Sequence, residues 1–192
     1  MILLLLSFPQ ASLPQVIHVV IRDAMPRDIP GLTRIYNQAV VASSATFDLR
    51  PQTIEERTEW FSHYGGTHPL IVAESDGRVL GYCSLSHFRP KPAYDHTVES
   101  SVYVDNACHG QGIGKALMRA ALARAQRLGH HVVIAGITAG NEASVRLHES
   151  LGFRRVGQLR EVGRKFDRWQ DVHFYQLVLP QGETAEPGEL TL

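Results

Sequence analysis

A single carboxylate lies in a run of residues that is otherwise typical of a β-strand. Residues 97–104 read TVESSVYV, and in an extended chain Glu99 shares one side with Ser101 and Tyr103. Desolvation between apolar neighbours disfavours the charged form of a carboxylate, so we expect a raised pKa for Glu99. Such a carboxylate could act as a general base, and a charge-paired strand residue would fit the same pattern.

A glycine-rich turn follows this strand. Residues 109–114 read HGQGIG, and Lys115 then opens a helix-forming run. Glycine lets the backbone approach a ligand without a Cβ in the way, and free N–H groups at a helix N-terminus bind anions. A Walker A loop is excluded, because the stretch from Gly110 to Lys115 is one residue too short and Ala116 supplies no hydroxyl. A dinucleotide loop is excluded because no acidic residue occurs between Lys115 and Asn141. Another anion-binding loop and a plain helix cap remain.

Local signals predict the elements that must hold these residues in place. Thr53 and Glu56 have the spacing of a capping box, and Asp76-Gly77 between two strand-like runs is typical of a hairpin turn. Residues 163–165 are the expected turn between the last two strands. We expect strands over residues 16–22, 70–74, 78–86, 97–104, 131–137, 153–162 and 168–179, and helices after Pro26, from Thr53 to His63, from Lys115 onward and from Asn141 to Leu151.

The composition limits the class of function. The chain has 192 residues with 19 basic and 19 acidic side chains, so it suits one α/β domain and carries no formal net charge. A neutral chain gives no sign of a nucleic acid or an anionic membrane as partner. Cys83 and Cys108 provide neither a disulfide framework nor metal-ligand spacing. We therefore expect no metal, and a protein of the reducing cytoplasm.

The two ends of the chain differ from its middle. Residues 1–15 begin with a short apolar run that lacks a basic start and is broken by Pro9 and Pro14, so we interpret them as an extension outside the fold. Residues 181–192 have the composition of a disordered tail. No stretch approaches the roughly 18 apolar residues of a membrane span. The predicted domain is therefore residues 16–180.

Two motifs in this order resemble the GNAT acetyltransferase superfamily. Residues 109–114 resemble its pyrophosphate loop, Q/R-x-x-G-x-G/A, with His109 where the family usually has Gln or Arg. Residues 141–153 match a second family motif, N-x-x-[AS]-x-x-L-[YH]-x-x-x-G-F. Within the superfamily, residues 96–104 (HTVESSVYV) and 163–172 (GRKFDRWQDV) resemble the phosphinothricin and methionine sulfoximine N-acetyltransferases.

The resemblance implies a fold and a reaction. The fold would be the GNAT fold, an α/β (α+β) architecture with a central mixed, mostly antiparallel sheet of about seven strands and about four flanking helices. The reaction would be acetylation of the α-amine of a small amino acid or analogue, by direct attack on the thioester of acetyl-CoA, without a metal. The resembling enzymes also imply a homodimer.

The reaction assigns roles to particular residues. A primary amine must lose a proton before it attacks a thioester, which makes Glu99 the candidate base. By resemblance, His148 would be the acid that protonates the departing thiolate, or it would share the proton transfer with Glu99. A helix residue satisfied by a backbone carbonyl is the alternative. Backbone N–H groups around residues 102–104 would stabilise the oxyanion. Residues expected to contact acetyl-CoA are Val102, Tyr103, Val104, His109, Gly110, Gln111, Gly112, Ile113, Gly114, Lys115, Asn141 and Ser144.

The acceptor is expected beside the connection that leads into the strand of Glu99. Arg89 and Lys91 would supply a cation for its α-carboxylate, and Phe47 and Tyr94 an apolar wall; a solvated loop and a loop-anchoring aromatic are the alternatives. Two other functions stay open. One is acetylation of a different amine, such as a protein N-terminus or a polyamine, and the other is an acyl-CoA sensor without turnover.

Overall fold

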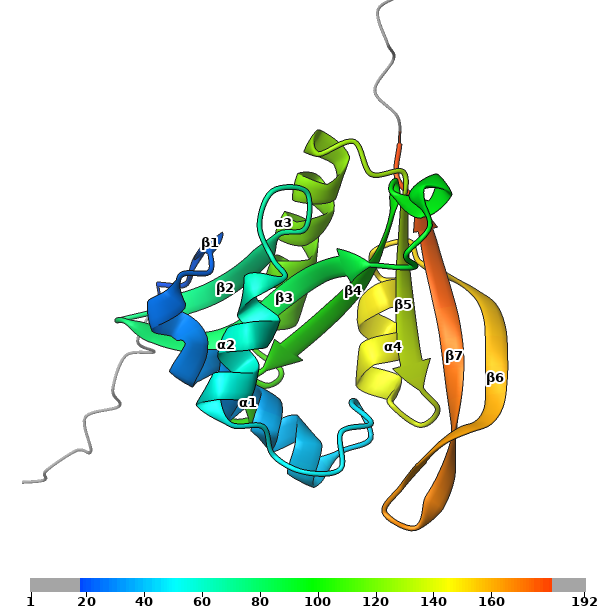
Figure 1. The fold of residues 1–192 in the computed structure, drawn as a ribbon, viewed down its shortest axis with the longest axis horizontal. Helices are drawn as coiled ribbons and strands as arrows, with labels where there is room; N and C mark the ends of the chain where they lie inside the picture. The colour runs from blue at the N-terminus through cyan, green and yellow to red at the C-terminus, as the bar shows by residue number, and fades with distance from the viewer. Residues whose placement is uncertain (1–17, 181–192) are drawn as a thin grey trace, which may run out of the picture.

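Seven strands form one sheet in the order β1-β2-β3-β4-β5-β7-β6 in the computed structural model, which describes residues 18–180 (Figure 1). All neighbouring pairs are antiparallel except β4 and β5, which confirms the predicted mixed, mostly antiparallel sheet. The strands are β1 (Val20–Asp23), β2 (Leu70–Ser75), β3 (Arg78–His87), β4 (Thr97–Val104), β5 (Val132–Thr138), β6 (Arg154–Lys165) and β7 (Arg168–Val178). The α-helices of the described residues are α1 (Ile29–Ala42), α2 (Ile54–Ser62), α3 (Ile113–Arg127) and α4 (Glu142–Glu149), and short 3-10 turns are η1 (Pro26–Asp28), η2 (Pro92–Tyr94) and η3 (Asn106–Cys108).

The strands β4 and β5 are neighbours for only part of their length. They pair in parallel at three positions, from Thr97 with Val132 to Glu99 with Ile134, and then diverge (Figure 1). Each strand keeps its other neighbour, because β4 pairs with β3 and β5 pairs with β7 throughout. The divergence opens a cleft in the middle of the sheet, and Glu99 belongs to the last pair before it.

Two hydrophobic cores fix the two faces of the sheet. In β2, Ile71 and Ala73 join the core formed with α3, whereas Leu70 and Val72 join the core formed with α1 and α2, as a period of two requires. Each large apolar side chain buried in this way stabilises the fold by about 1.5–3 kcal/mol. The helices α1 and α2 lie over the β2–β4 half of their face and leave the β5–β7 half uncovered (Figure 1).

Several local predictions are confirmed. The Thr53 hydroxyl accepts from the backbone N–H of Glu56 at 3.3 Å, and the backbone N–H of Thr53 donates to the Glu56 carboxylate at 2.9 Å. This is the reciprocal capping box that the sequence indicates. Asp76 and Gly77 have φ values of +50° and +76°, which is the left-handed pair that a two-residue hairpin turn needs.

Two predicted boundaries are wrong. The last hairpin turns at Phe166 and Asp167, with φ values of +52° and +57°, so residues 163–165 lie in β6 and not in the turn. Position 163 is occupied by glycine because of packing and not because of a turn, since a Cβ there would lie 2.2 Å from the ring of Phe47. Among the described residues the first strand covers Val20–Asp23, so it ends one residue later than predicted and does not include residues 18 and 19; the predicted positions 16 and 17 lie outside the described residues.

Some predictions concern residues that the structure does not describe. The interpretations of residues 1–15 and 181–192 concern parts of the chain beyond residues 18–180. Between these limits, no helix combines the length and the apolar character needed to cross a bilayer.

Candidate active site

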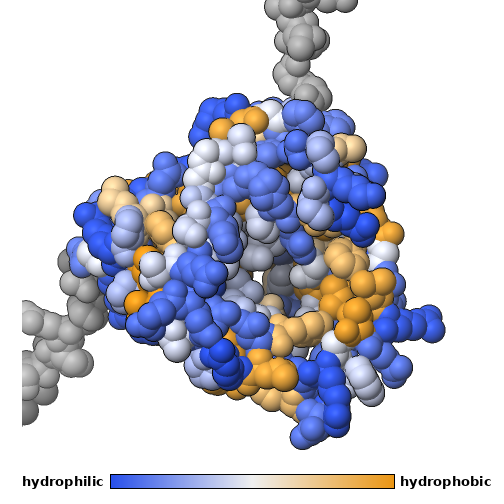
Figure 2. Space-filling model, in the orientation of Figure 1, coloured by the Kyte–Doolittle hydropathy of each residue, from blue (hydrophilic) through white to orange (hydrophobic). Residues whose placement is uncertain are grey.

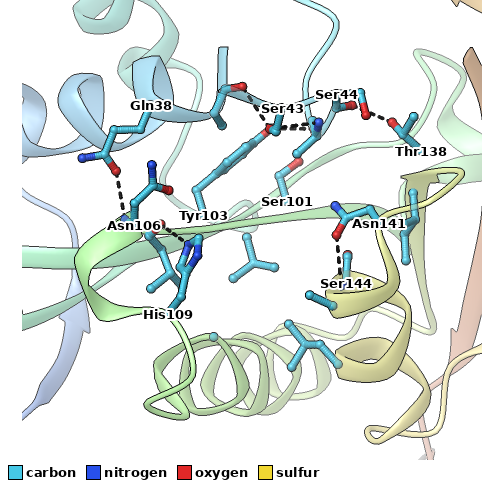
Figure 3. Close-up of a pocket in the computed structure, with 18 of the residues that line it drawn as sticks. Gln38, Ser43, Ser44, Ser101, Tyr103, Asn106, His109, Thr138, Asn141 and Ser144 are labelled. Carbon is cyan, nitrogen blue, oxygen red and sulfur yellow. Dashed lines mark hydrogen bonds between the residues drawn. The ribbon is translucent and has the colours of Figure 1, made fainter. Parts of the chain in front are cut away.

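The cleft between β4 and β5 contains a cavity of about 840 Å³. Its walls come from the C-terminal end of α1, the second half of β4, the glycine loop, β5 and the start of α4 (Figure 3). Figure 2 shows a hollow in this part of the surface, beside hydrophobic area over the β5–β7 half of the sheet. The glycine loop and residues 141–148 of the second motif therefore line one cavity, although they are far apart in the sequence.

The glycine loop presents backbone N–H groups to this cavity. Gly110 and Gly112 have φ values of +76° and +80°, and Gly112 is the N-cap of α3 without a side-chain capping bond. The first turn of α3 contains no acidic residue. Since the first N–H groups of a helix have no intrahelical partner, this end of α3 is suited to a phosphate.

The three positions of the loop are occupied by glycine for different structural reasons. A Cβ at Gly110 or Gly112 would meet no atom of the described chain within 4 Å, so these two residues are required by their left-handed backbone. A Cβ at Gly114 would make ordinary contacts with Leu147 at 3.5 Å and Val104 at 3.6 Å. Gly114 therefore faces α4 and β4, and its backbone conformation is open to other residues.

The start of the loop is held by a buried carboxylate that sequence reasoning did not single out. Asp105 is only 2% exposed and accepts hydrogen bonds from Arg34 of α1 at 2.5 Å and Arg78 of β3 at 2.7 Å. Burial alone would raise the pKa of Asp105, but the hydrogen bonds from Arg78, Arg34, the backbone N–H of Ala107 and Gln38 together outweigh it and hold the pKa well below its usual range. No local sequence signal marks this contact, because its partners are distant along the chain.

The edge of β4 supplies the other expected contacts to acetyl-CoA. Pairing with β5 ends at Glu99, so the β5-facing backbone of residues 100–104 has no strand partner among the described residues. Val102, Tyr103 and Val104 all line the cavity. Across it, Asn141 caps α4 by accepting from the backbone N–H of Ser144 at 3.2 Å, and both residues also line the cavity.

Glu99 lies at the point where the two strands separate. Its carboxylate is half-buried, and a Cβ added to Gly136 of β5 would lie 3.5 Å from its Oε1 atom. Burial raises the pKa of Glu99, which confirms the predicted direction. Glu99 itself does not line the cavity, whereas its neighbours Ser100 and Ser101 and the facing residue Gly136 do, so its carboxylate lies at the edge of the cavity.

His148 lines the same cavity from α4 and is only 3% exposed. Its Nδ1 lies 2.8 Å from the carbonyl oxygen of Ser144. A carbonyl can only accept, so Nδ1 carries the proton and Nε2 of the neutral ring keeps a lone pair. Burial lowers the pKa of His148, and the bond to the Ser144 carbonyl offsets only part of this effect. The side chain is therefore a neutral imidazole at pH 7.

None of the four expected acceptor residues lines the cavity. Phe47, in the connection between α1 and α2, packs against Gly163 of β6. Arg89, Lys91 and Tyr94 are exposed in the connection between β3 and β4 and do not line the cavity. The Arg89 guanidinium instead lies 5.8 Å from the Tyr94 ring centroid. Their acceptor role stays a prediction.

A wall of hydroxyl groups is a feature that sequence reasoning missed. Ser43, Ser44, Ser101, Tyr103 and Thr138 all line the cavity on the side away from the glycine loop (Figure 3). The Thr138 hydroxyl donates to the carbonyl of Ser44 at 2.6 Å, which ties the end of α1 to β5. The Ser43-Ser44 pair was visible in the sequence only as a polar connection, because nothing local indicates that it lies over β5.

A model described as the acetyltransferase (GNAT) family matches residues 32–153. The chain belongs to the GNAT acetyltransferase family. It is an acyltransferase, and the fold over the described residues is the GNAT fold that the motifs predicted.

Relatives of this GNAT acetyltransferase act on small amino-acid analogues according to their names. The L-methionine sulfoximine/L-methionine sulfone acetyltransferase of Pseudomonas aeruginosa is 42% identical over 86% of this chain and 97% of that protein. The phosphinothricin N-acetyltransferase of Streptomyces coelicolor is 40% identical over 85% of this chain and 98% of that protein. A crystal structure of a phosphinothricin acetyltransferase from Sinorhizobium meliloti in complex with acetyl-CoA has a TM-score of 0.82 and 35% identity, covering 90% of this chain and 95% of that one.

Proposed function

We propose that this GNAT acetyltransferase transfers the acetyl group of acetyl-CoA to the α-amine of a small amino acid or analogue of the methionine sulfoximine or phosphinothricin type. The observation that carries the proposal is the cavity at the β4–β5 divergence, which is lined by the glycine loop and by Gly136, the residue beside the half-buried carboxylate of Glu99. The relatives support the acceptor class.

The residues around the cavity fit acetyl-CoA. Its pyrophosphate would lie against residues 109–115, where the N–H groups of α3 are free of side-chain caps. Its pantetheine arm carries amides, which match the β5-facing edge of β4 at residues 102–104, where β4 has no strand partner among the described residues, and Asn141 and Ser144 would flank it. Acetyl-CoA supplies the activated acyl group, a thioester with a good leaving group.

Glu99 is the proposed base. A raised pKa lets its carboxylate take a proton from the ammonium of the acceptor, which frees the nitrogen lone pair for attack on the thioester carbon. The C–N bond forms as the C–S bond breaks. Backbone N–H groups of residues 102–104 would stabilise the negative charge on the carbonyl oxygen during this step.

His148 has a narrower role than a simple acid. Because its ring is neutral and Nδ1 is committed to Ser144, it can protonate the thiolate only after Nε2 has accepted a proton. The attacking nitrogen must lose a second proton as the amide forms, so His148 is proposed to accept that proton at Nε2 and to pass it on to sulfur. The net reaction is amine plus thioester to amide plus thiol.

The acceptor carboxylate is proposed to be held by Arg89, with Lys91 nearby and with Phe47 and Tyr94 as apolar wall. We also propose a homodimer, because Arg89 lies outside the cavity of its own chain. The edge strand β6 and its neighbour β7 expose large apolar side chains, which a second copy would cover; they are Val156, Leu159, Val162 and Trp169. The free cysteines support the proposal that the enzyme acts in the cytoplasm.

A thiol-release assay with a panel of acceptors tests the function. Methionine sulfoximine, methionine sulfone and phosphinothricin should release CoA at rates well above those with a polyamine or a peptide N-terminus. Acetyl-CoA binding without release on any acceptor would favour a sensor. Faster release with spermidine than with any amino-acid analogue would refute the acceptor class.

A further inference from the structure

The turn of the last hairpin has a large aromatic residue at a position where small or polar residues are usual. Lys165 of β6 pairs with Arg168 of β7, so Phe166 and Asp167 form a two-residue turn. Both have a left-handed backbone, with φ values of +52° and +57°. Turns of this kind favour Asn and Gly, and a bulky side chain is strained there. Such strain in a folded chain points to a function for the side chain.

Phe166 does not serve the hydrophobic core. It is 55% exposed and belongs to neither of the two core clusters. Instead it lines the cavity at the β4–β5 divergence, and among residues 154–178 it is the one that does so. The ring of Phe166 therefore lies at the rim of the cavity, partly open to solvent.

Two contacts hold the tip of this hairpin against the connection between α1 and α2. The hairpin extends past the end of β5, where it has no strand neighbour to support it (Figure 1). Lys165 is only 3% exposed, and its Nζ donates to the carbonyl of Thr46 at 2.7 Å. The ring of Phe47 packs against the backbone of Gly163. The Lys165 ammonium also lies 5.2 Å from the Phe166 ring centroid, so the ring and the connection are held by the same side chain.

This connection lies on the side of the cavity that acetyl-CoA would leave open. The helix α3, which follows the glycine loop, packs on one face of the sheet, whereas α1 and α2 pack on the other. With acetyl-CoA at the glycine loop, the opposite wall is the end of α1, where Ser43 and Ala45 line the cavity. Phe166 is beside that wall, because the hairpin tip is tied to the residues that follow it. An acceptor between this wall and Glu99 would therefore have its side chain near the Phe166 ring.

We propose that Phe166 determines which amino acids the enzyme accepts, because its ring covers the outer end of the acceptor side chain and limits its size. The inference rests on the proposed function and narrows its substrate class. A compact side chain, such as that of methionine sulfoximine, fits beneath the ring, whereas a large aromatic side chain collides with it. Because the ring is partly exposed in the free protein, an acceptor that fits removes apolar surface from water on binding, which stabilises the complex.

The test replaces each of the two turn residues by asparagine. Phe166→Asn removes the ring, and asparagine tolerates the left-handed backbone, so the hairpin should fold at least as well as in the wild type. Asp167→Asn is the matched control, because it occupies the next position of the same turn, has the same kind of backbone and does not line the cavity. For the wild type and both variants we would measure kcat/KM with L-methionine sulfoximine and with L-tryptophan, the KM for acetyl-CoA, and the melting temperature.

Phe166→Asn should raise the ratio of kcat/KM for tryptophan to kcat/KM for methionine sulfoximine by about 10-fold or more, the usual size of discrimination by an apolar contact. The KM for acetyl-CoA should stay at the wild-type value, because the glycine loop is untouched. Asp167→Asn should keep the wild-type ratio. The same ratio in Phe166→Asn, Asp167→Asn and the wild type would overturn the inference, also if Phe166→Asn lost activity equally with both acceptors. A wild type that acetylates spermidine but neither amino acid would instead overturn the proposed function.

Discussion

Replacing Gly112 by alanine tests the glycine loop with a change that adds one methyl group. Gly112 has φ +80°, and the added Cβ would meet no protein atom within 4 Å. A steric clash with the rest of the chain is therefore excluded, and the whole penalty is backbone strain. The left-handed region costs an L-residue about 1–2 kcal/mol.

The strain can appear in either of two measurable quantities. If the free loop relaxes to another conformation, the complex must restore it, and acetyl-CoA affinity falls by about 5- to 30-fold. If the loop stays left-handed, the free energy of unfolding falls by the same 1–2 kcal/mol, which lowers the melting temperature by about 2–8 °C. Calorimetric affinity and thermal unfolding of Gly112→Ala measure both.

Gly114→Ala is the matched control, two residues further along the same loop. Its added Cβ would make only ordinary contacts, at 3.5 Å with Leu147 and 3.6 Å with Val104, and alanine favours the helix. We expect stability equal to or slightly greater than that of the wild type, because no left-handed backbone is strained at this position. If Gly112→Ala and Gly114→Ala were both indistinguishable from the wild type in both measurements, the reasoning about this loop would be refuted.

Three further changes separate the other parts of the site. His148→Gln should lower kcat but leave acetyl-CoA affinity unchanged, whereas equal loss of both would indicate a packing role. Because burial lowers the pKa of His148, the folded state resists its protonation, so wild-type stability should decrease as the pH falls below about 6.5, and less so in His148→Gln. Arg89→Ala should raise the acceptor KM by about 10-fold with little change in the KM for acetyl-CoA, and an unchanged acceptor KM would remove the proposed carboxylate clamp. Gly163→Ala should displace the Phe47 ring, 2.2 Å from the added Cβ, and raise the acceptor KM alone; Gly157→Ala, in the same strand with open space around its Cβ, is the control.

Local patterns were enough to predict most of the fold. The capping box at Thr53, the turn at Asp76-Gly77 and the helix start at Asn141 each depend on residues close in sequence, and each is found in the structure. The same holds for the direction of the pKa shift of Glu99, because a carboxylate between apolar neighbours in a strand is expected to be partly desolvated.

The missed features depend on contacts between distant segments. The last hairpin was misplaced because Gly163 suggested a turn, whereas its reason is the Phe47 ring, which lies over 100 positions earlier in the chain. The clamp on Asp105 joins α1, β3 and the glycine loop, and no short window contains its three partners. The neutral state of His148 could not be inferred either, since it requires both burial and a carbonyl at 2.8 Å from Nδ1.

The pH dependence of Glu99→Gln tests the central claim most directly. We would measure kcat with methionine sulfoximine and the affinity for acetyl-CoA, for the wild type and the variant, from about pH 6 to pH 9. The amide keeps the shape of the side chain but cannot take a proton, so kcat should fall by roughly 10²-fold or more at unchanged affinity. The wild-type rate should also decline as the pH falls, because a base with a raised pKa loses its free carboxylate first. Full activity of Glu99→Gln across this range would contradict the account and leave the carboxylate with a structural role.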